Sequence, residues 1–293
     1  MMISNPRRAF VAGRVANGDL DGWLSDHAVI VEGEHIDSIV PRAQLPGDIG
    51  ETSELVDLGD VSLLPGLIDA HCHMHCSARP GALQHALTDT DQQLTMRAVS
   101  AMGKALFAGT TTIRDIGSRN QVAFPIREAI ASGTIPGPRL LVSGQPITIT
   151  AGHCWFFSSQ ADTTHEVGTA VRTQVRLGAD LIKVMATGGM FTPTANPARP
   201  QYSTQTLQAA VGEAERVGIP IVGHTLRPGR GTLPRCRRSS SHPCKVACTR
   251  SRSLNRLSTR RGPADRRSRT LGGSDDWAHL QRDHGAPATR GKR

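Results

Sequence analysis

Short apolar segments alternate with amphipathic, helix-like segments between residues 66 and 226, and this alternation constrains the fold more than any other feature. The apolar segments read GLIDAH, TTTIRD, RLLVSG, DLIKVMA and IPIVGH. Helices are predicted between them at about 92–107, 124–131, 164–177 and 204–217. Such alternation is typical of parallel strands joined by right-handed crossovers, so we predict an α/β fold. The chain has no glycine-rich phosphate-binding turn after the first strand, which disfavours a doubly wound sheet.

Polar side chains follow these strands at the end where a parallel barrel places its chemistry. They are His71, His73, Arg114, Asp115, Lys183 and His224. Their shared position is a stronger signal than any one of them alone. We therefore predict a barrel with a catalytic or binding site at that end.

The segment before the barrel is predicted to form a small sheet, because residues 9–65 contain alternating stretches such as HAVIVEGEHIDSIV. The chain is 38% hydrophobic, which is enough for a core in at least part of it. No stretch reaches the roughly 18 apolar residues of a membrane span, and the N-terminus lacks a secretory signal. We therefore expect a cytoplasmic protein without a membrane partner. Six cysteines without a disulfide pattern favour reduced thiols.

His71 and His73 are two residues apart in a strand, so their side chains point to one face and could converge on a metal ion. This spacing is weak evidence alone, because such pairs are more often surface or structural residues. Cys72 alternates with them and should point into the helix layer. Lys183 lies in an apolar strand, either as a snorkelling or ion-paired side chain or as a neutral amine that forms a carbamate with carbon dioxide.

Several motifs together resemble one family. LLPGLIDAHCH, GTTTIRDIGS, ITITAGHCWF, GADLIKVMATGGMFTP, QYS and IPIVGHT occur in the order and at the intervals of the metal-dependent amidohydrolase superfamily. The resemblance is to its imidazolonepropionase-like and Xaa-Pro dipeptidase-like branch, and it covers about residues 9–226. It implies an incomplete (β/α)8 TIM-type barrel, with about five strands in residues 66–226, preceded by half of a small β-sandwich in residues 1–65.

The same resemblance implies a metal centre. His71 and His73 resemble the ligands of the first strand, Lys183 the carboxylated lysine of the fourth, and His224 the ligand of the fifth. One or two divalent ions, usually zinc in this family, would produce hydroxide from bound water and polarise the carbonyl of an amide, lactam or Xaa-Pro dipeptide. A small-molecule substrate, and a homo-oligomer in the intact family member, are implied only at the level of the family.

Other polar residues are assigned roles with alternatives. His153 resembles a histidine near the substrate, and a loop residue without a role is the alternative. Tyr202, the one tyrosine, faces either the substrate as a catalytic residue or the core as a packing residue. Arg114 and Asp115 are interpreted as a structural ion pair below the site, and His75 as a supporting or loop residue.

The composition changes abruptly after the fifth strand. Residues 227–293 hold 16 Arg and 2 Lys against 4 Asp and no Glu, a net charge of +14, whereas residues 1–226 carry −5. Few apolar residues occur in this tail, so we predict that it is disordered. Three interpretations stay open. They are a basic arm that binds nucleic acid, a zinc element with His242, Cys244 and Cys248, and translation in the wrong reading frame.

The reading-frame interpretation is favoured. If the codons for residues 245–252 start at the previous third base, the genetic code permits Gly-Gly-Val-His-Ser-Ile-Glu, which is close to the GVDSIE segment of the family. On this interpretation the chain lacks the sixth-strand histidine, the eighth-strand aspartate and the second half of the sandwich. We then expect an inactive, poorly folded product. The alternative function is a nucleic-acid-associated protein that acts through the Arg-rich tail.

Overall fold

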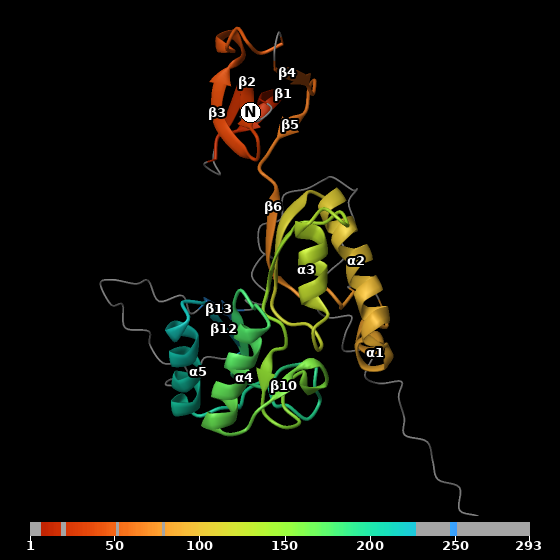
Figure 1. The fold of residues 1–293 in the computed structure, drawn as a ribbon, viewed down its shortest axis with the longest axis vertical. Coiled ribbons are helices and arrows are strands. Elements are labelled where there is room, and N and C mark those ends of the chain that lie inside the picture. The colour runs from red at the N-terminus through yellow and green to blue at the C-terminus, as the bar shows by residue number, and fades with distance from the viewer. Residues whose placement is uncertain (1–6, 19–21, 51–52, 78–79, 227–246, 251–293) are drawn as a thin grey trace, which may run out of the picture. The chain divides into compact units, whose positions relative to one another are not determined.

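The computed structural model describes residues 7–18, 22–50, 53–77, 80–226 and 247–250 (Figure 1). All described residues belong to one compact unit within residues 1–251. No helix among the described residues is both long and apolar enough to cross a membrane.

The N-terminal residues form one five-stranded sheet, as the sequence predicts. Its strands are β1 (Arg7–Ala16), β2 (Trp23–Glu32), β3 (His35–Pro41), β4 (Glu54–Asp57) and β5 (Ser62–Leu63). β2 is antiparallel to β1 and β3, while β4 and β5 run parallel to β1. Gly33 has a φ of 60° in the two-residue turn between β2 and β3, a left-handed conformation that glycine adopts without strain. A short 3-10 helix, Arg42–Gln44, follows β3.

Each of the five apolar segments predicted for the barrel contains a parallel strand. The first sheet contains β6 (Leu67–Cys72), β7 (Thr110–Asp115) and β8 (Arg139–Val142). The second contains β9 (Ile147–Thr148), β10 (Ser159–Gln160), β11 (Ile182–Met185), β12 (Ile221–Thr225) and β13 (Ala247–Arg250), in the order β10-β9-β11-β12-β13. β8 pairs with β7 and β9 pairs with β11, so the segment that contains β8 and β9 connects the two sheets.

β13 lies in the tail and pairs in parallel with β12, with Val222 opposite Ala247 and His224 opposite Thr249. The prediction of a tail without structure is therefore wrong for residues 247–250. The open edge of β12 offers unpaired backbone N–H and C=O groups, and pairing with them does not require an apolar segment. The rest of residues 227–293 lies outside the described part of the chain, as do two of the three residues considered for a zinc element.

Five α-helices are described, and four of them were predicted. They are α1 (Ala82–Thr88), which was missed, and α2 (Asp91–Phe107), α3 (Ala123–Ala131), α4 (Thr164–Arg176) and α5 (Thr204–Arg216). The predicted helices begin within one residue of the observed ones. Capping boxes fix two of these starts: Thr90 with Gln93 begins α2, and Thr163 with Glu166 begins α4. A 3-10 helix, Trp155–Phe157, lies between β9 and β10.

Helices cover the outer face of the parallel strands in two apolar clusters (Figure 1). On the first sheet, Leu94 of α2 and Phe124 of α3 belong to one cluster with Ile113 of β7. On the second sheet, α4 and α5 pack on β11 and β12. An inner layer, formed by Ile116, Leu181 and Val222, is separate from both clusters. The core is therefore built as in a parallel barrel, with helices outside and a second layer inside.

β6 is the edge strand of the first sheet, and in the described residues it pairs with β7 alone. Its apolar side chains are open to solvent: Leu67 is 59% and Ile68 71% exposed. Exposed apolar residues on an unpaired edge are the arrangement that the sequence predicts for an incomplete barrel.

Candidate functional site

Lys183 lies on the inner face of β11. Its neighbours Ile182 and Val184 pack outward against α4 and α5, so strand alternation turns Lys183 the other way. It is 1% exposed, and none of the ion pairs between described residues includes it. Burial lowers the pKa of Lys183 to about 8. A buried amine without a counter-charge destabilises a fold, which indicates a functional residue.

His71 and His73 lie together at the end of β6, with 5.7 Å between their ring centroids. Burial lowers the pKa of each imidazole to about 4, and the charge of Lys183 contributes to both shifts. Cys72, between them, packs against the apolar cluster under α2 and α3, as predicted. The two histidines are therefore neutral near pH 7, and a neutral imidazole is the form that binds a metal.

His224, at the end of β12, lies beside His153 from the loop after β9. Their ring centroids are 4.5 Å apart and the ring planes are tilted by 32°. Burial lowers the pKa of His224 to about 3 and that of His153 to about 4, with Lys183 again contributing to both. His224 Nε2 and His153 Nδ1 are buried and have no hydrogen-bond partner among the described residues.

The predicted metal ligands therefore lie on one inner surface around Lys183. No group of three or more His, Cys, Asp or Glu side chains in the described residues is arranged to hold an ion by itself. The donor chemistry nevertheless fits a divalent metal, because the imidazoles are neutral and His224 keeps a nitrogen to which no described residue hydrogen-bonds. Lys183 would add oxygen ligands only as a carbamate.

Gln201 holds the loop of His153, and sequence reasoning missed it. Its Oε1 accepts a hydrogen bond from the His153 backbone N–H at 2.6 Å. Its Nε2 donates to Thr148 Oγ1 at 3.0 Å and to the Met185 carbonyl at 2.8 Å, at the ends of β9 and β11. Gly189 leaves room for the ring of the same histidine, since an added Cβ would lie 2.4 Å from two atoms of the His153 ring. The sequence signal for Gln201 is the QYS motif, in which it directly precedes Tyr202.

Tyr202 does not join the histidines. It is buried in the apolar cluster with α4 and α5, and its hydroxyl donates to the Ala161 carbonyl at 2.8 Å. Burial also raises the pKa of this phenol far above its ordinary value. These contacts favour the packing role of Tyr202 over the catalytic one. Gln201 and Tyr202 are adjacent and point in different directions, so only Gln201 reaches the loop of His153.

Arg114 and Asp115 do not form the predicted ion pair. They are consecutive strand residues, so their side chains leave opposite faces of β7. Arg114 Nε donates to the Ala70 carbonyl at 2.8 Å, and its charge contributes to the lowered pKa of Lys183 on the inner face. Asp115 is fully buried on the other face, where burial raises its pKa to about 6.

His75 is buried and lies outside the group around Lys183. Its Nδ1 is 3.3 Å from Ser118 Oγ, and its ring contacts Phe157 with 5.2 Å between centroids. The sequence interpretation of His75 as a supporting residue agrees with this position.

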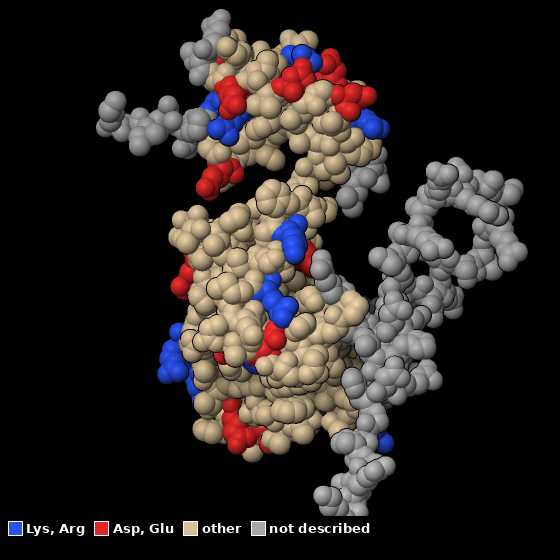
Figure 2. Space-filling view, turned by 90° about the vertical axis from the view of Figure 1, so that its right-hand side faces the viewer, with Lys and Arg blue, Asp and Glu red and all other residues tan. Residues whose placement is uncertain are grey.

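The described surface bears on the nucleic-acid alternative. On the face drawn in Figure 2, acidic and basic side chains are intermixed, and they are widely spaced over the barrel strands and helices. That face carries no continuous basic patch in the described residues. Of the Arg-rich tail on which the alternative depends, the structure describes residues 247–250 alone.

A parallel α/β barrel segment with histidines and a buried lysine at its inner strand ends, preceded by a small β-sheet, places the chain in the class of α/β-barrel proteins. The chain matches the amidohydrolase family over residues 62–236 and the NagA composite domain over residues 9–56. It belongs to the amidohydrolase family. The match extends ten residues beyond the segment in which we recognised motifs.

Characterised relatives narrow the branch. The chain is 29% identical to ochratoxinase from Aspergillus niger over 241 residues, which cover 73% of this chain and 49% of that protein. It is 46% identical to imidazolonepropionase from Pseudomonas aeruginosa over 50 residues, 17% of this chain and 12% of that protein. The chain thus spans about half the length of the ochratoxinase that it matches.

Solved structures agree with this assignment. The crystal structure of Aspergillus niger ochratoxinase superimposes with a TM-score of 0.68 at 26% identity, covering 77% of this chain and 57% of that one. A Xaa-Pro dipeptidase with bound methionine in the active site superimposes with a TM-score of 0.67 at 27% identity, covering 75% and 56%. The family, the branch and the barrel fold predicted from the motifs are therefore confirmed.

Proposed function

We propose that this site hydrolyses a carbon–nitrogen bond of a small amide, lactam or Xaa-Pro dipeptide with the help of a divalent metal. The metal that we propose is zinc. The observation that carries the proposal is Lys183, a buried amine that has no counter-charge among the described residues and that contributes to the lowered pKa values of the nearby histidines. The names of the similar proteins, an ochratoxinase and a Xaa-Pro dipeptidase, support this class of substrate.

His71, His73 and His224 would hold the metal together with Lys183. A divalent ion bound there would supply Lewis acidity and lower the pKa of a bound water. The neutral imidazoles already provide nitrogen lone pairs, so no proton has to be removed from them near pH 7. The proposed site holds one or two ions, and metal analysis of the loaded chain measures their number.

Lys183 is proposed to be carboxylated. A pKa of about 8 leaves an appreciable fraction of neutral amine near neutral pH, and only the neutral amine attacks carbon dioxide. The ammonium first loses one proton to give the amine, whose nitrogen bonds to the carbon of carbon dioxide as one C=O π bond opens. A second proton then leaves the nitrogen for solvent, so a buried cation becomes an anion with two oxygen donors. This change removes the unfavourable buried positive charge and adds hard ligands for a divalent metal.

His153 is proposed to contact the substrate. Gln201 holds its loop and Gly189 leaves room for its ring, and its Nδ1 is buried next to His224 with no hydrogen-bond partner in the described part of the chain. A neutral imidazole at this place can exchange a hydrogen bond with a polar atom of the substrate. The packing contacts of Tyr202 leave it no comparable role.

The assay that tests this function compares the chain as written with the protein encoded when the reading frame after codon 226 is restored, both loaded with zinc in bicarbonate buffer. The substrates are N-acyl-proline, Xaa-Pro dipeptides and a lactam. We expect zinc-dependent release of the amine product from the restored protein, abolished by Lys183→Ala and retained by Lys104→Ala, a change of an exposed lysine on α2. Hydrolysis that persists in Lys183→Ala would contradict the proposal, as would a zinc-loaded, folded restored protein that cleaves none of these substrates.

We also propose that the residues after position 226 are read out of frame, and that the chain as written is inactive for this reason. The abrupt change to Arg-rich composition supports this. Sequencing the gene across codons 224–250 tests it. An intact frame would favour the alternative, a basic arm. Such an arm should bind polynucleotides with a steep dependence on salt, and deletion of residues 227–293 should abolish this binding. A cytoplasmic location and a homo-oligomeric state are likewise proposals.

A further inference from the structure

The end of β7 and the loop after it contact three successive residues that follow β6. Residues 115–118 face residues 73–75. The contacts join the Gly117 carbonyl to His73 Nδ1 at 2.8 Å, Asp115 Oδ1 to the Met74 backbone N–H at 2.9 Å, and Ser118 Oγ to His75 Nδ1 at 3.3 Å. One short loop therefore determines how the end of the first barrel strand is presented.

The donors and acceptors of this loop fix the tautomers of two histidines. A carbonyl oxygen can only accept, so the proton that joins His73 to Gly117 lies on His73 Nδ1. Ser118 Oγ donates its one proton to Asp115 Oδ2 at 2.9 Å, so toward His75 it can only accept. His75 Nδ1 must then carry a proton too, and Nε2 is the free nitrogen of both rings.

Asp115, at the end of β7, forms no ion pair with any described residue. It is fully buried, and Arg114 lies on the opposite face of β7. A buried carboxylate is retained only where hydrogen bonds compensate for lost hydration, and Met74 and Ser118 supply them here. The carboxylate therefore accepts hydrogen bonds from Met74, which lies between His73 and His75, and from Ser118, which contacts His75.

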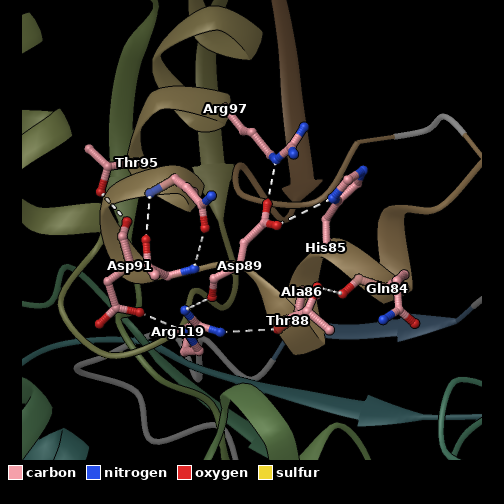
Figure 3. Close-up of polar contacts among 11 residues, drawn as sticks. Gln84, His85, Ala86, Thr88, Asp89, Asp91, Thr95, Arg97 and Arg119 are labelled. Carbon is pink, nitrogen blue, oxygen red and sulfur yellow. Dashed lines mark hydrogen bonds and ion pairs between the residues drawn. The ribbon is translucent and has the colours of Figure 1, made fainter.

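The loop is itself anchored at the residue that follows Ser118. Arg119 reaches the junction of α1 and α2, where it donates to Asp91 Oδ1 at 2.8 Å and to the Ala86 carbonyl at 3.2 Å, and also to the Asp89 carbonyl (Figure 3). Gly117 allows the close approach to His73 and Pro146, since an added Cβ would lie 3.3 Å from His73 Cε1 and 2.4 Å from Pro146 Cγ. The chain of contacts is thus held in one geometry.

We propose that Asp115 is a positioning residue of the site. Through Ser118 it sets the tautomer of His75, and through Met74 it fixes the segment that presents His73 Nε2 to the inner face. The consequence for metal binding rests on the proposed function, whereas the tautomers do not.

Two-bond 1H–15N spectra of the histidines in the metal-free full chain test the proposal near neutral pH. His73→Gln and His75→Gln assign the signals. We expect both residues as Nδ1–H tautomers in the wild-type chain. In Asp115→Asn the amide donates to Ser118 Oγ, so the serine proton is released toward His75, which should switch to Nε2–H while His73 stays unchanged. An Nε2–H tautomer of His75 in the wild-type chain would overturn the proposal, as would an unchanged His75 in folded Asp115→Asn.

Two further variants keep the test sharp. Ser118→Ala removes only a hydroxyl and should release His75 into a tautomer mixture even if Asp115→Asn fails to fold; a pure Nδ1–H signal would contradict the proposal. Asp180→Asn is the matched control, because Asp180 also accepts a backbone N–H, that of Val142 at 2.8 Å, but hydrogen-bonds to no described histidine. It should leave both signals unchanged.

Zinc titration measures the consequence for the site. Asp115→Ala should weaken zinc binding about 10- to 100-fold, the range found for residues that orient metal ligands, and Asp115→Asn should recover most of the loss. Unchanged affinity in Asp115→Ala would overturn the positioning role. If the wild-type chain binds no zinc, the proposed function fails, and the tautomers of His73 and His75 still decide for or against the role of Asp115.

Discussion

The rings of His153 and His224 lie 4.5 Å apart, and each keeps a buried nitrogen that has no partner among the described residues. An unpartnered buried polar atom costs on the order of 1–3 kcal/mol, so two of them side by side indicate a surface built for a ligand. Lys183 adds a third unfavourable group at the same place. The site is therefore expected to trade stability for function.

Gly189→Ala should destabilise the chain by roughly 1–3 kcal/mol, because its new methyl group would overlap the His153 ring. Urea unfolding measures the change. Gly212→Ala on α5 is the control, since nothing lies within 4 Å of its added Cβ and alanine favours a helix. In a His153→Ala background the same Gly189→Ala change should be close to neutral, and a cost that persists there would contradict the proposed contact.

Gln201→Met should cost more stability than Tyr202→Phe. The first change leaves the His153 N–H and the Met185 carbonyl without partners, at about 1–3 kcal/mol each. The second removes one hydroxyl that bonds to Ala161, at about 1 kcal/mol. The histidine spectra should also show a changed His153 signal in Gln201→Met alone. A larger response to Tyr202→Phe would reverse the roles assigned to these two residues.

Lys183→Met should stabilise the folded chain by roughly 1–3 kcal/mol, because an apolar side chain replaces a buried, unpaired amine. The lowered pKa gives the sign of the pH effect: the folded chain holds the lysine proton less tightly than the unfolded chain. The gain should therefore be full below about pH 8 and shrink as the pH rises toward the ordinary value of 10.5. Thermal unfolding at two pH values checks this, and a destabilised Lys183→Met would contradict it.

Acid should destabilise the fold through its buried histidines. The pKa values of His75 and His153, about 3 and about 4, lie below the ordinary 6.5, so the unfolded chain takes up protons first. Stability is then full above about pH 6.5 and falls toward pH 4, by up to about 1.4 kcal/mol per pH unit for each histidine. The raised pKa of Asp115 opposes this below about pH 6. Urea midpoints should fall less steeply in His153→Gln, and an unchanged slope would refute the assignment.

The sequence predicted the helices of the barrel well because local chemistry determines their ends. Thr90 with Gln93 and Thr163 with Glu166 satisfy the first N–H groups of α2 and α4, and such signals lie within four residues. The inner placement of Lys183 was equally accessible, because it follows from the period of two in a strand.

The remaining features depend on tertiary contacts. The sequence did not reveal that Gln201 rather than Tyr202 reaches the loop of His153, since both follow the same strand. The predicted ion pair between Arg114 and Asp115 was wrong because strand alternation places consecutive side chains on opposite faces. β13 was missed because its pairing partner is the edge of β12 and not an apolar cluster.

The most direct test of the account is zinc binding by the purified full chain, measured by calorimetry in bicarbonate buffer with His71→Ala, Lys183→Ala and His27→Ala. His27 lies on the N-terminal sheet, where it hydrogen-bonds to the Ser25 carbonyl, and serves as the control. We predict tight zinc binding that His71→Ala and Lys183→Ala weaken at least about tenfold and His27→Ala leaves unchanged. Zinc binding of equal strength in all four proteins, or none in the folded wild-type chain, would contradict the assignment of this site.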